Sequence, residues 1–572
     1  MKRESQKGVW KRTFNIFRQF EIPYVLFLLY FLLSIVSTKV GLLYLPYYSK
    51  MQTGEIGEMS TLWGFIGFML LSLVVGMCEV IPQFYAESQV TRNLQKKLFY
   101  KVLHLPVKDF EQETPSELIS RVTFDSELAN SIIASILGFL SGFATMWMML
   151  SDMSAINSVL GFILIPIFIY ILITVWVDGK IGFLTRRRLR LAMSQTTAFF
   201  SEHMPNLLNI KQLGAEEDEK KRGKEAIEIM YKADLYDIFL GMITTFFSGS
   251  TNTIIAILVF VFGAKAVREG AMDVTGLAQF YQLILLAYGA IEGIPSLYTS
   301  LMCSNGELYY VGKLMASEEE QYERKVEMPL VDEDIHFENV SFAYDEENTL
   351  ENVSCTIPGG KKTAIAGLNG SGKTTMLKLI ERFYKVSSGT IRYGETSVED
   401  IHLGQWRQNF GYVLQKPRLF DASIRENIVY GIEREVSEEE VITAAKKACA
   451  WDFIEKIPEG LDFVVGDNGC RLSQGEKQRI AIARAILVDP AYLLLDEATS
   501  NVDVESKAII DKALSALMKG RTTVFISHDP QEIKTADHVI VLNNKSVEAQ
   551  GTAEEIAGTS ATLEKILTGG TA

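Results

Sequence analysis

Six long apolar stretches occupy the first 305 residues and constrain the fold more than any other feature of the sequence. They lie near residues 22–47, 60–88, 131–153, 156–178, 238–265 and 275–302. Each supplies the roughly 20 residues that a helix needs to cross about 30 Å of hydrocarbon. The second, fifth and sixth are longer than a bilayer requires, so we expect their helices to extend into the cytoplasm.

The distribution of positive charge predicts the orientation of these stretches. Loops 89–130 and 179–237 are rich in lysine and arginine, whereas the opposite loops contain only Lys50, Lys265 and Arg268. Positive residues stay on the cytoplasmic side, so the N-terminus and both long loops are expected to be cytoplasmic. Residues 8–20 mix aromatic and basic side chains, which favours an amphipathic helix on the inner surface. An ordinary solvated helix is the alternative.

Both cytoplasmic loops are predicted to be helical, with a distinct segment at the far end of each. These segments are Asp109 to Val122 and Ala198 to Glu219, and Pro115 and Pro205 interrupt their helical patterns. Plain solvated loops would fit as well. Two long helical loops at matching places favour an organised docking surface.

A few polar side chains lie inside the apolar stretches, namely Lys39, Glu79, Gln83 and Glu292. Charges are costly in hydrocarbon and usually face a bundle interior or a water-filled cavity. We therefore predict that they line a substrate cavity. The alternative is that they pair with one another, or reach water from positions near the helix ends.

From about residue 330 the chain is charged and has the composition of a soluble α/β protein. The net charge of −14 over 572 residues argues against nucleic acid as the main partner. The five cysteines show no CxxC pairing and predict neither a zinc site nor a disulfide framework.

The second half contains the phosphate-binding pattern G-x-x-x-x-G-K-[ST]. Gly367, Leu368, Asn369, Gly370, Ser371, Gly372, Lys373, Thr374 and Thr375 form this stretch, between a strand-like run and a helical one. Glycines let backbone N–H groups approach a phosphate, and the helix adds its positive end. We expect Lys373 to reach the β- and γ-phosphates and Thr374 to bind Mg²⁺. Tyr344, which ends an alternating strand pattern, is a candidate for stacking on adenine.

Four further motifs follow in order: Phe410 to Ile428, Leu472 to Leu487, Tyr492 to Asp503, and Thr522 to His528. Tyr492 to Glu497 and Thr522 to His528 are predicted to be buried strands. With the phosphate loop and the six apolar stretches the four motifs resemble the ATP-binding-cassette (ABC) transporters, and the whole chain looks like an exporter half-transporter. The resemblance implies six transmembrane helices fused to an α/β P-loop NTPase domain. It divides the chain into an elbow helix (1–21), a transmembrane domain (22–305), a linker (306–332) and a nucleotide-binding domain (333–572). Within the transmembrane domain it places coupling segments near 109–122 and 198–219, although Pro115 stands where a glycine is usual.

The resemblance also implies roles for single residues. Glu497 is expected to be the general base that polarises the attacking water, with His528 near the γ-phosphate. Asp496, Thr374 and Gln415 are expected to hold Mg²⁺, and Asp503 belongs to a loop beside the nucleotide. Two domains would enclose two ATP molecules, each between one phosphate loop and the partner's Ser473, Gln474, Gly475 and Glu476.

This signature departs from the usual LSGGQ, because Gln474 replaces a glycine and Glu476 replaces the final glutamine. An acid near ATP is expected to weaken the site that this chain completes in its partner. A homodimer and a heterodimer with a divergent partner both stay open, and the heterodimer is slightly favoured because many such exporters pair unequal halves.

The implied function is ATP-driven export of a hydrophobic or amphipathic drug, lipid or peptide across a bacterial plasma membrane. An importer built on the exporter fold, such as a siderophore system, is an alternative. An ATP-gated channel or regulatory subunit would be expected to lack the catalytic glutamate or histidine, and both are present. A soluble DNA-repair ATPase is inconsistent with the apolar stretches and the acidic charge.

Overall fold

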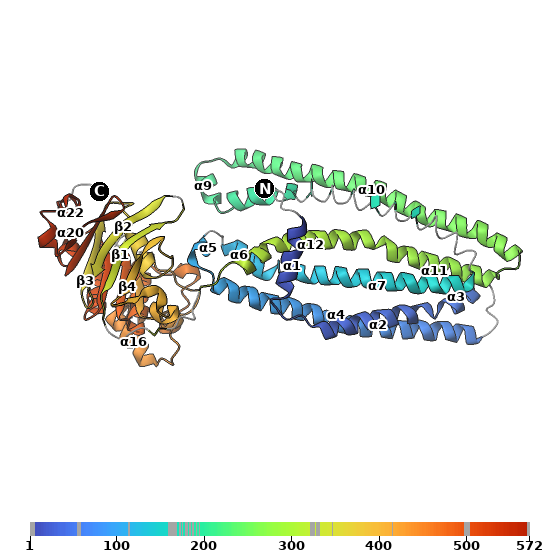
Figure 1. The fold of residues 1–572 in the computed structure, drawn as a ribbon, viewed down its shortest axis with the longest axis horizontal. Coiled ribbons are helices and arrows are strands. Elements are labelled where there is room, and N and C mark those ends of the chain that lie inside the picture. Colours follow the sequence, from blue (N-terminus) through green and yellow to red (C-terminus); the bar gives the residue numbers. More distant parts are fainter. Residues whose placement is uncertain are drawn as a thin grey trace. The chain divides into compact units, whose positions relative to one another are not determined.

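The computed structural model describes residues 6–568 with a set of gaps (Figure 1). These gaps are 54–58, 112–114, 321–325, 328–331, 346, 415, 497–503 and most of 158–194, of which 169–170, 173, 176–177, 181, 185, 188–189 and 191–193 are described. The chain divides into two compact units. The first comprises Met1–His104 and Glu113–Ser317, and the second comprises Leu105–Gln112 and Glu318–Ala572.

The first unit is helical throughout its described part. Its helices are α1 (Gln6–Phe17), α2 (Tyr24–Leu42), α3 (Leu45–Gln52), α4 (Met59–Leu103), α6 (Pro115–Thr123), α7 (Glu127–Ile156), α9 (Leu207–Gln212), α10 (Glu216–Arg268), α11 (Val274–Glu292) and α12 (Ile294–Ala316). The predicted helix at 8–20 is therefore present as α1. The two prolines interrupt the helices as expected, since Pro115 begins α6 and Pro205 lies in the turn before α9.

Four of these helical segments are long and apolar enough to cross a membrane: Tyr24–Gln52, Met59–Leu103, Glu117–Ile156 and Glu216–Arg268. They contain the predicted stretches 22–47 (from Tyr24), 60–88, 131–153 and 238–265. The 45 residues of α4 and the 53 of α10 confirm that the second and fifth stretches exceed what a bilayer needs. The stretch 156–178 lies mostly outside the described residues.

The sixth stretch differs from the prediction, because Gly293 separates α11 from α12 within 275–302. Pro295 occupies one of the first two positions of α12. Proline has no N–H to donate, but at that position no helical partner is required, so a new helix begins there. The side chain of Glu292 lies outside the described residues.

Polar side chains join α2 to α7 inside the first unit. The Ser34 and Ser141 hydroxyls are 2.9 Å apart, and those of Thr38 and Thr145 are 3.4 Å apart. Ser34 and Thr38 are four residues apart on α2, as are Ser141 and Thr145 on α7. The hydroxyls therefore form a stripe along one face of each helix. Small residues let two membrane helices approach closely.

At the end of that stripe Lys39 Nζ lies 3.0 Å from Asp152 Oδ1. The two side chains are 51% and 33% exposed. Asp152 is not among the polar residues singled out from the sequence, so the contact is not the predicted pairing of those residues with one another, and a cavity role for Lys39 stays a prediction. Gln83 donates a hydrogen bond to Glu87 within α4, at 2.9 Å.

The second unit contains two sheets. The six-stranded sheet has the order β10-β9-β3-β8-β7-β6, and the four-stranded sheet has the order β2-β1-β4-β5. The strands are β1 (Ile335–Ala343), β2 (Asn348–Ile357), β3 (Lys362–Gly367), β4 (Ser388–Tyr393), β5 (Thr396–Ser397), β6 (Phe410–Val413), β7 (Tyr492–Asp496), β8 (Thr522–Ile526), β9 (His538–Asn543) and β10 (Ser546–Gly551). Strands predicted before the phosphate loop and at 492–496 and 522–526 are confirmed.

The described part of the second unit also contains α5 (Val107–Glu111) and ten further α-helices. They are α13 (Lys373–Ile380), α14 (Leu403–Gln408), α15 (Ile424–Val429), α16 (Glu438–Lys447), α17 (Trp451–Ile454), α18 (Gln474–Val488), α19 (Val504–Met518), α20 (Pro530–Lys534), α21 (Ala553–Ile556) and α22 (Ala561–Leu567). The helical run predicted after the phosphate loop is present as α13.

The six-stranded sheet is buried on both faces, which explains its nearly continuous apolar strands. Along β7, Leu493 and Leu495 join one hydrophobic core, and Tyr492 and Leu494 join the other. The first core includes residues of α15, α16, α18 and α19. The second includes the four-stranded sheet, α13 and Trp406 of α14. This double burial fixes the sheet whose edge carries the phosphate loop.

Candidate nucleotide-binding site

Three motifs follow the carboxyl ends of neighbouring strands in the six-stranded sheet. Its strands β3, β8 and β7 are parallel, and Ile526 of β8 is aligned with Ile365 of β3 and with Asp496 of β7. The phosphate loop, Asp496 and His528 therefore all lie at the carboxyl ends of neighbouring strands. This edge is where open α/β sheets bind their ligands.

The loop between β3 and α13 has a conformation that requires glycine. Gly370 and Gly372 have φ values of +79° and +98°, which side chains rarely adopt. A Cβ at Gly367 would lie 2.4 Å from the Leu542 carbonyl oxygen, and one at Gly372 would lie 2.5 Å from a Leu350 methyl. The glycines of the motif are therefore needed for both backbone angle and space.

Lys373 folds back over this loop. Its buried Nζ donates to the carbonyl oxygens of Gly367 at 2.9 Å and of Leu368 at 3.1 Å. The Ser371 hydroxyl is buried and has no hydrogen-bond partner among the described residues. An ammonium, an orphaned hydroxyl and a helix N-terminus around a glycine cradle fit a polyphosphate. Thr374 is exposed and Thr375 is buried.

Tyr344 belongs to an aromatic group next to this loop. Its hydroxyl lies 3.3 Å from Thr375 Oγ1, and its ring packs edge-on against those of Phe342 and Tyr384. Lys378 Nζ lies 5.6 Å from the centres of the Tyr344 and Tyr384 rings. The half-buried Tyr344 is thus held beside the phosphate loop, where stacking on adenine remains a proposal.

The short helix α5 (Val107–Glu111), in the loop 89–130, contacts the same group. Glu111 accepts hydrogen bonds from the Tyr384 hydroxyl and from Lys378 Nζ, the latter at 3.0 Å. The bond from Tyr384 holds the pKa of Glu111 below its ordinary value, and burial raises the pKa of Tyr384. The predicted coupling segment 109–122 includes this contact, but Glu111 itself was not singled out from the sequence.

Sequence reasoning missed a second carboxylate, Glu381, which follows α13. Its pKa is raised to about 8, chiefly by burial, with the positive charge of Arg407 lowering it and the negative charge of Asp496 adding to the rise. Glu381 therefore holds its proton more strongly than an ordinary glutamate. The sequence carried no signal for it, because a glutamate at a helix end is ordinarily solvated.

The signature serine begins α18. Ser473 is its N-cap, and Glu476 Oε2 accepts from both the backbone N–H and the hydroxyl of Ser473 at 2.8 Å. This is a capping box, for which glutamate serves as well as glutamine. The acid therefore faces its own helix cap. The described hydrogen bonds of Ser473 all stay within that cap, and Gly475 is buried.

This geometry yields a prediction for Glu476→Gln. Glutamine keeps the cap, so the melting temperature should stay within about 2 °C. Removing about 0.5–1 kcal/mol of screened repulsion should lower KM for ATP by about two- to fivefold. Steady-state ATPase assays on the reconstituted chain measure this, with Ser473→Ala as the comparison that loses the cap at about 1 kcal/mol. An unchanged KM would show that the acid does not act on ATP.

Three predicted site residues, Gln415, Glu497 and Asp503, lie outside the described residues. His528 is exposed just after β8, and Gln474 is half-buried at the start of α18. The structure thus brings together the phosphate loop, Tyr344, Asp496 and His528. A glycine-cradled loop and a strand that ends in aspartate define the class: a P-loop ATPase domain that follows a helical membrane region.

Comparison with known proteins identifies the family. Residues 27–291 match the family model described as ABC transporter transmembrane region, and residues 350–500 match the one described as ABC transporter. The chain belongs to the ABC transporter family, with the exporter-type arrangement of both regions in one chain. It is a multi-pass membrane protein that binds ATP and couples ATP hydrolysis to transport.

Several relatives cover most of the chain. A multidrug resistance ABC transporter ATP-binding and permease protein of Lactococcus lactis subsp. lactis is 30% identical over 85% of this chain and 82% of that protein. An ATP-dependent lipid A-core flippase of Albidiferax ferrireducens is 29% identical over 86% of each. The serine protease/ABC transporter B family protein tagA of Dictyostelium discoideum is 30% identical over 89% of this chain, which spans only 29% of that longer protein.

Proposed function

We propose that the chain exports a hydrophobic or amphipathic substrate by alternating access, as one half of a dimer. The observation that carries this is the glycine cradle with its orphaned Ser371 hydroxyl, in one chain with apolar helices that are long enough to span a membrane. Relatives named for multidrug resistance and for lipid A-core support a drug or lipid as substrate. A peptide fits the apolar helices equally.

Within this proposal the site residues have separate tasks. Lys373 and the loop amides hold the phosphates, and Tyr344 stacks on adenine. Asp496, Thr374 and Gln415 hold Mg²⁺, for which carboxylate, hydroxyl and amide oxygens are suitable ligands. Bound Mg²⁺ would neutralise charge that develops on the phosphates. Glu497 orients and deprotonates water, and His528 supports the γ-phosphate.

Alternating access follows from differential affinity. ATP that touches both domains only in the closed dimer favours closure by the difference between its affinities for the two states. Hydrolysis and phosphate loss remove the bridging charge and allow reopening. The exposed position of Ser473 supports its availability to a partner's nucleotide.

Exposed apolar side chains support a partner. Leu207, Leu208 and Leu213, in and beside α9, are 49–80% exposed. In the second unit the rings of Phe420 and Tyr430 contact each other and are 49% and 55% exposed. Apolar groups of this kind outside the apolar stretches are expected at a protein interface. Native mass spectrometry of the chain expressed alone would detect a homodimer as twice the chain mass. A monomer without ATPase activity would indicate an unequal partner.

Transport direction separates export from import. In inverted membrane vesicles an exporter accumulates substrate when ATP is added outside, whereas an importer depletes it. A panel of lipids, cationic drugs and apolar peptides should first be tested for stimulation of ATP hydrolysis. If ATP drives depletion of every accepted compound, the importer is the correct assignment.

Glu79 provides a test of the substrate cavity. It lies half-buried in α4, three residues before Pro82. Glu79→Gln should change substrate-stimulated ATP hydrolysis by about threefold or more, since a charge in an apolar region acts on bound substrate. Basal hydrolysis should stay constant. Glu225→Gln is the matched control, because it changes an exposed glutamate on α10 and should leave both basal and stimulated hydrolysis unchanged. The same stimulation in wild type and Glu79→Gln would reject the cavity role, and Glu292→Gln repeats the test.

A further inference from the structure

The connector that leaves the last helix of the membrane region contacts the nucleotide-binding domain through an ion pair. Helix α12 ends at Ala316, and Glu320 follows four residues later. The Glu320 carboxylate accepts two parallel bonds from the Arg407 guanidinium, at 2.8 and 2.7 Å. The two side chains are 10% and 21% exposed, so solvent screens the pair little. Such forked pairs fix orientation as well as distance.

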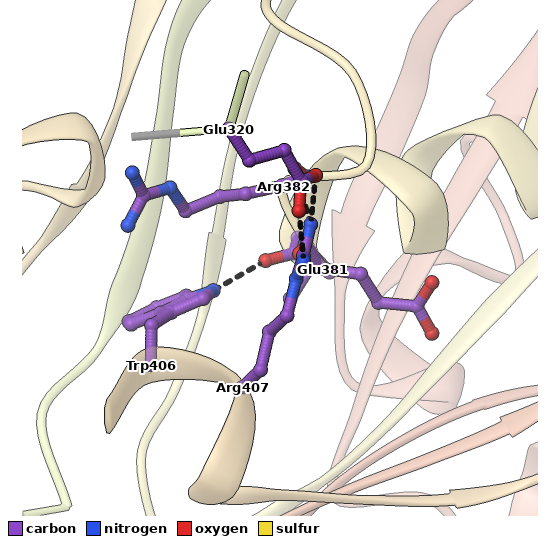
Figure 2. Close-up of polar contacts among 6 residues, drawn as sticks. Glu320, Glu381, Arg382, Trp406 and Arg407 are labelled. Carbon is purple, nitrogen blue, oxygen red and sulfur yellow. Dashed lines mark hydrogen bonds and ion pairs between the residues drawn. The ribbon is translucent and has the colours of Figure 1, made fainter. Parts of the chain in front are cut away.

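Arg407 at the same time closes the C-terminal end of α13 (Figure 2). Its Nε donates to the Glu381 carbonyl at 3.3 Å, and Nη2 donates to the Arg382 carbonyl at 3.1 Å. Trp406 Nε1 donates to the Ile380 carbonyl at 2.7 Å. The last carbonyls of a helix have no partners within it, and a cation is favourable beside them. The two neighbouring residues of α14 therefore hold this end of α13.

The opposite end of α13 is the phosphate loop. The helix has eight residues, about 12 Å in length, and begins at Lys373. A helix this short moves as a rigid body, so a shift of the backbone at Glu381 also shifts Lys373 at its other end. The connector has a second anchor near the other end of α14, where His402 N–H donates to the Val326 carbonyl at 3.0 Å.

We propose that Glu320 is a positioning residue for ATP binding: through Arg407 it holds the C-terminal end of α13 and thereby orients the phosphate loop at the other end. The proposal rests on the function proposed above for that loop. Glu320 acts on the end of α13 that lies opposite Lys373, so its effect is exerted on the arrangement of Lys373. The residues that follow α12 are then connected to the phosphate loop through the Glu320–Arg407 ion pair and the short helix α13.

The test uses the full chain in lipid nanodiscs. Equilibrium binding of ATP with Mg²⁺, kcat and KM for hydrolysis, and the melting temperature are measured for wild type and variants. Glu320→Gln removes the charge and keeps the shape, and Glu320→Asp keeps the charge on a shorter arm. Glu318→Gln is the matched control, because it changes an exposed acid two residues earlier.

We expect Glu320→Gln to raise the dissociation constant for ATP and KM by about tenfold, within the usual range for coupled sites. Its kcat at saturating ATP should fall by less than threefold. Glu320→Asp should raise the dissociation constant about two- to threefold, and Glu318→Gln should leave it unchanged. A purely structural role would lower the melting temperature and the fraction of active protein without this split between KM and kcat.

Wild-type ATP affinity in Glu320→Gln would overturn the proposal. If Glu320→Gln does not fold, wild-type affinity in Glu320→Asp would overturn it as well. If wild type itself bound no ATP, the function proposed for the loop would fail. A wild type that binds ATP alongside an unaffected Glu320→Gln would reject the positioning role alone.

Discussion

Replacing Glu497 with glutamine should lower ATP turnover by at least about a hundredfold and leave ATP trapped on the protein. A positioned general base contributes roughly 10²–10⁴-fold to such reactions. Glu497 directly follows Asp496, which ends β7 at the edge of the sheet that also carries the phosphate loop and His528. Glutamine has the same shape and still accepts a hydrogen bond, but it cannot take up the proton of the attacking water.

Phosphate release by the reconstituted chain measures turnover, and ATP retained after rapid desalting measures trapping. Glu459→Gln is a suitable control, since it changes an exposed glutamate of the same domain and should hydrolyse ATP like wild type. Hydrolysis by Glu497→Gln above a tenth of the wild-type rate would contradict the assignment of the base.

Replacing Lys373 with alanine should raise the dissociation constant for ATP by at least about tenfold, which corresponds to 1.4 kcal/mol. The Lys373 ammonium is buried and lies 2.9 and 3.1 Å from two loop carbonyl oxygens, close to where phosphate oxygens would bind. Its charge acts in a region with little solvent, where electrostatic attraction is stronger than in water. ATP hydrolysis should fall with binding.

Equilibrium binding of radiolabelled ATP checks this prediction. Alanine also leaves the two carbonyls without their donor, so the melting temperature must be measured in parallel. The Lys385→Ala variant is the matched control, because that lysine is exposed shortly after α13. Wild-type affinity in a folded Lys373→Ala variant would remove the phosphate-binding role from this loop.

The local elements of the ATPase domain follow from short-range sequence patterns. The apolar runs at 362–367, 492–496 and 522–526 form the strands β3, β7 and β8, because a parallel sheet buried on both faces requires continuous apolar side chains. Gly370 and Gly372 have positive φ values, which agrees with the expectation that glycines permit this loop its backbone angles. These features depend on neighbours in the chain, so the sequence displays them directly.

The division of the sixth apolar stretch was less visible. Both sides of Gly293 are apolar, and hydropathy does not record where one helix ends and the next begins. The sequence also predicted only part of what Glu476 does. Its charge is evident from the sequence, but its use in the helix cap of Ser473 depends on the direction of one side chain.

The sequence alone determined four of the long apolar helices, the phosphate loop and the strands β3, β7 and β8, because periodicity, glycine and length act locally. Only the tertiary structure decided that Lys39 pairs with Asp152, that Glu111 meets Tyr384, and that Arg407 joins Glu320 to the end of α13. The partners in these contacts are separated by 87 to 273 residues. Attraction between charged or polar groups depends on distance in space, which chain order does not encode.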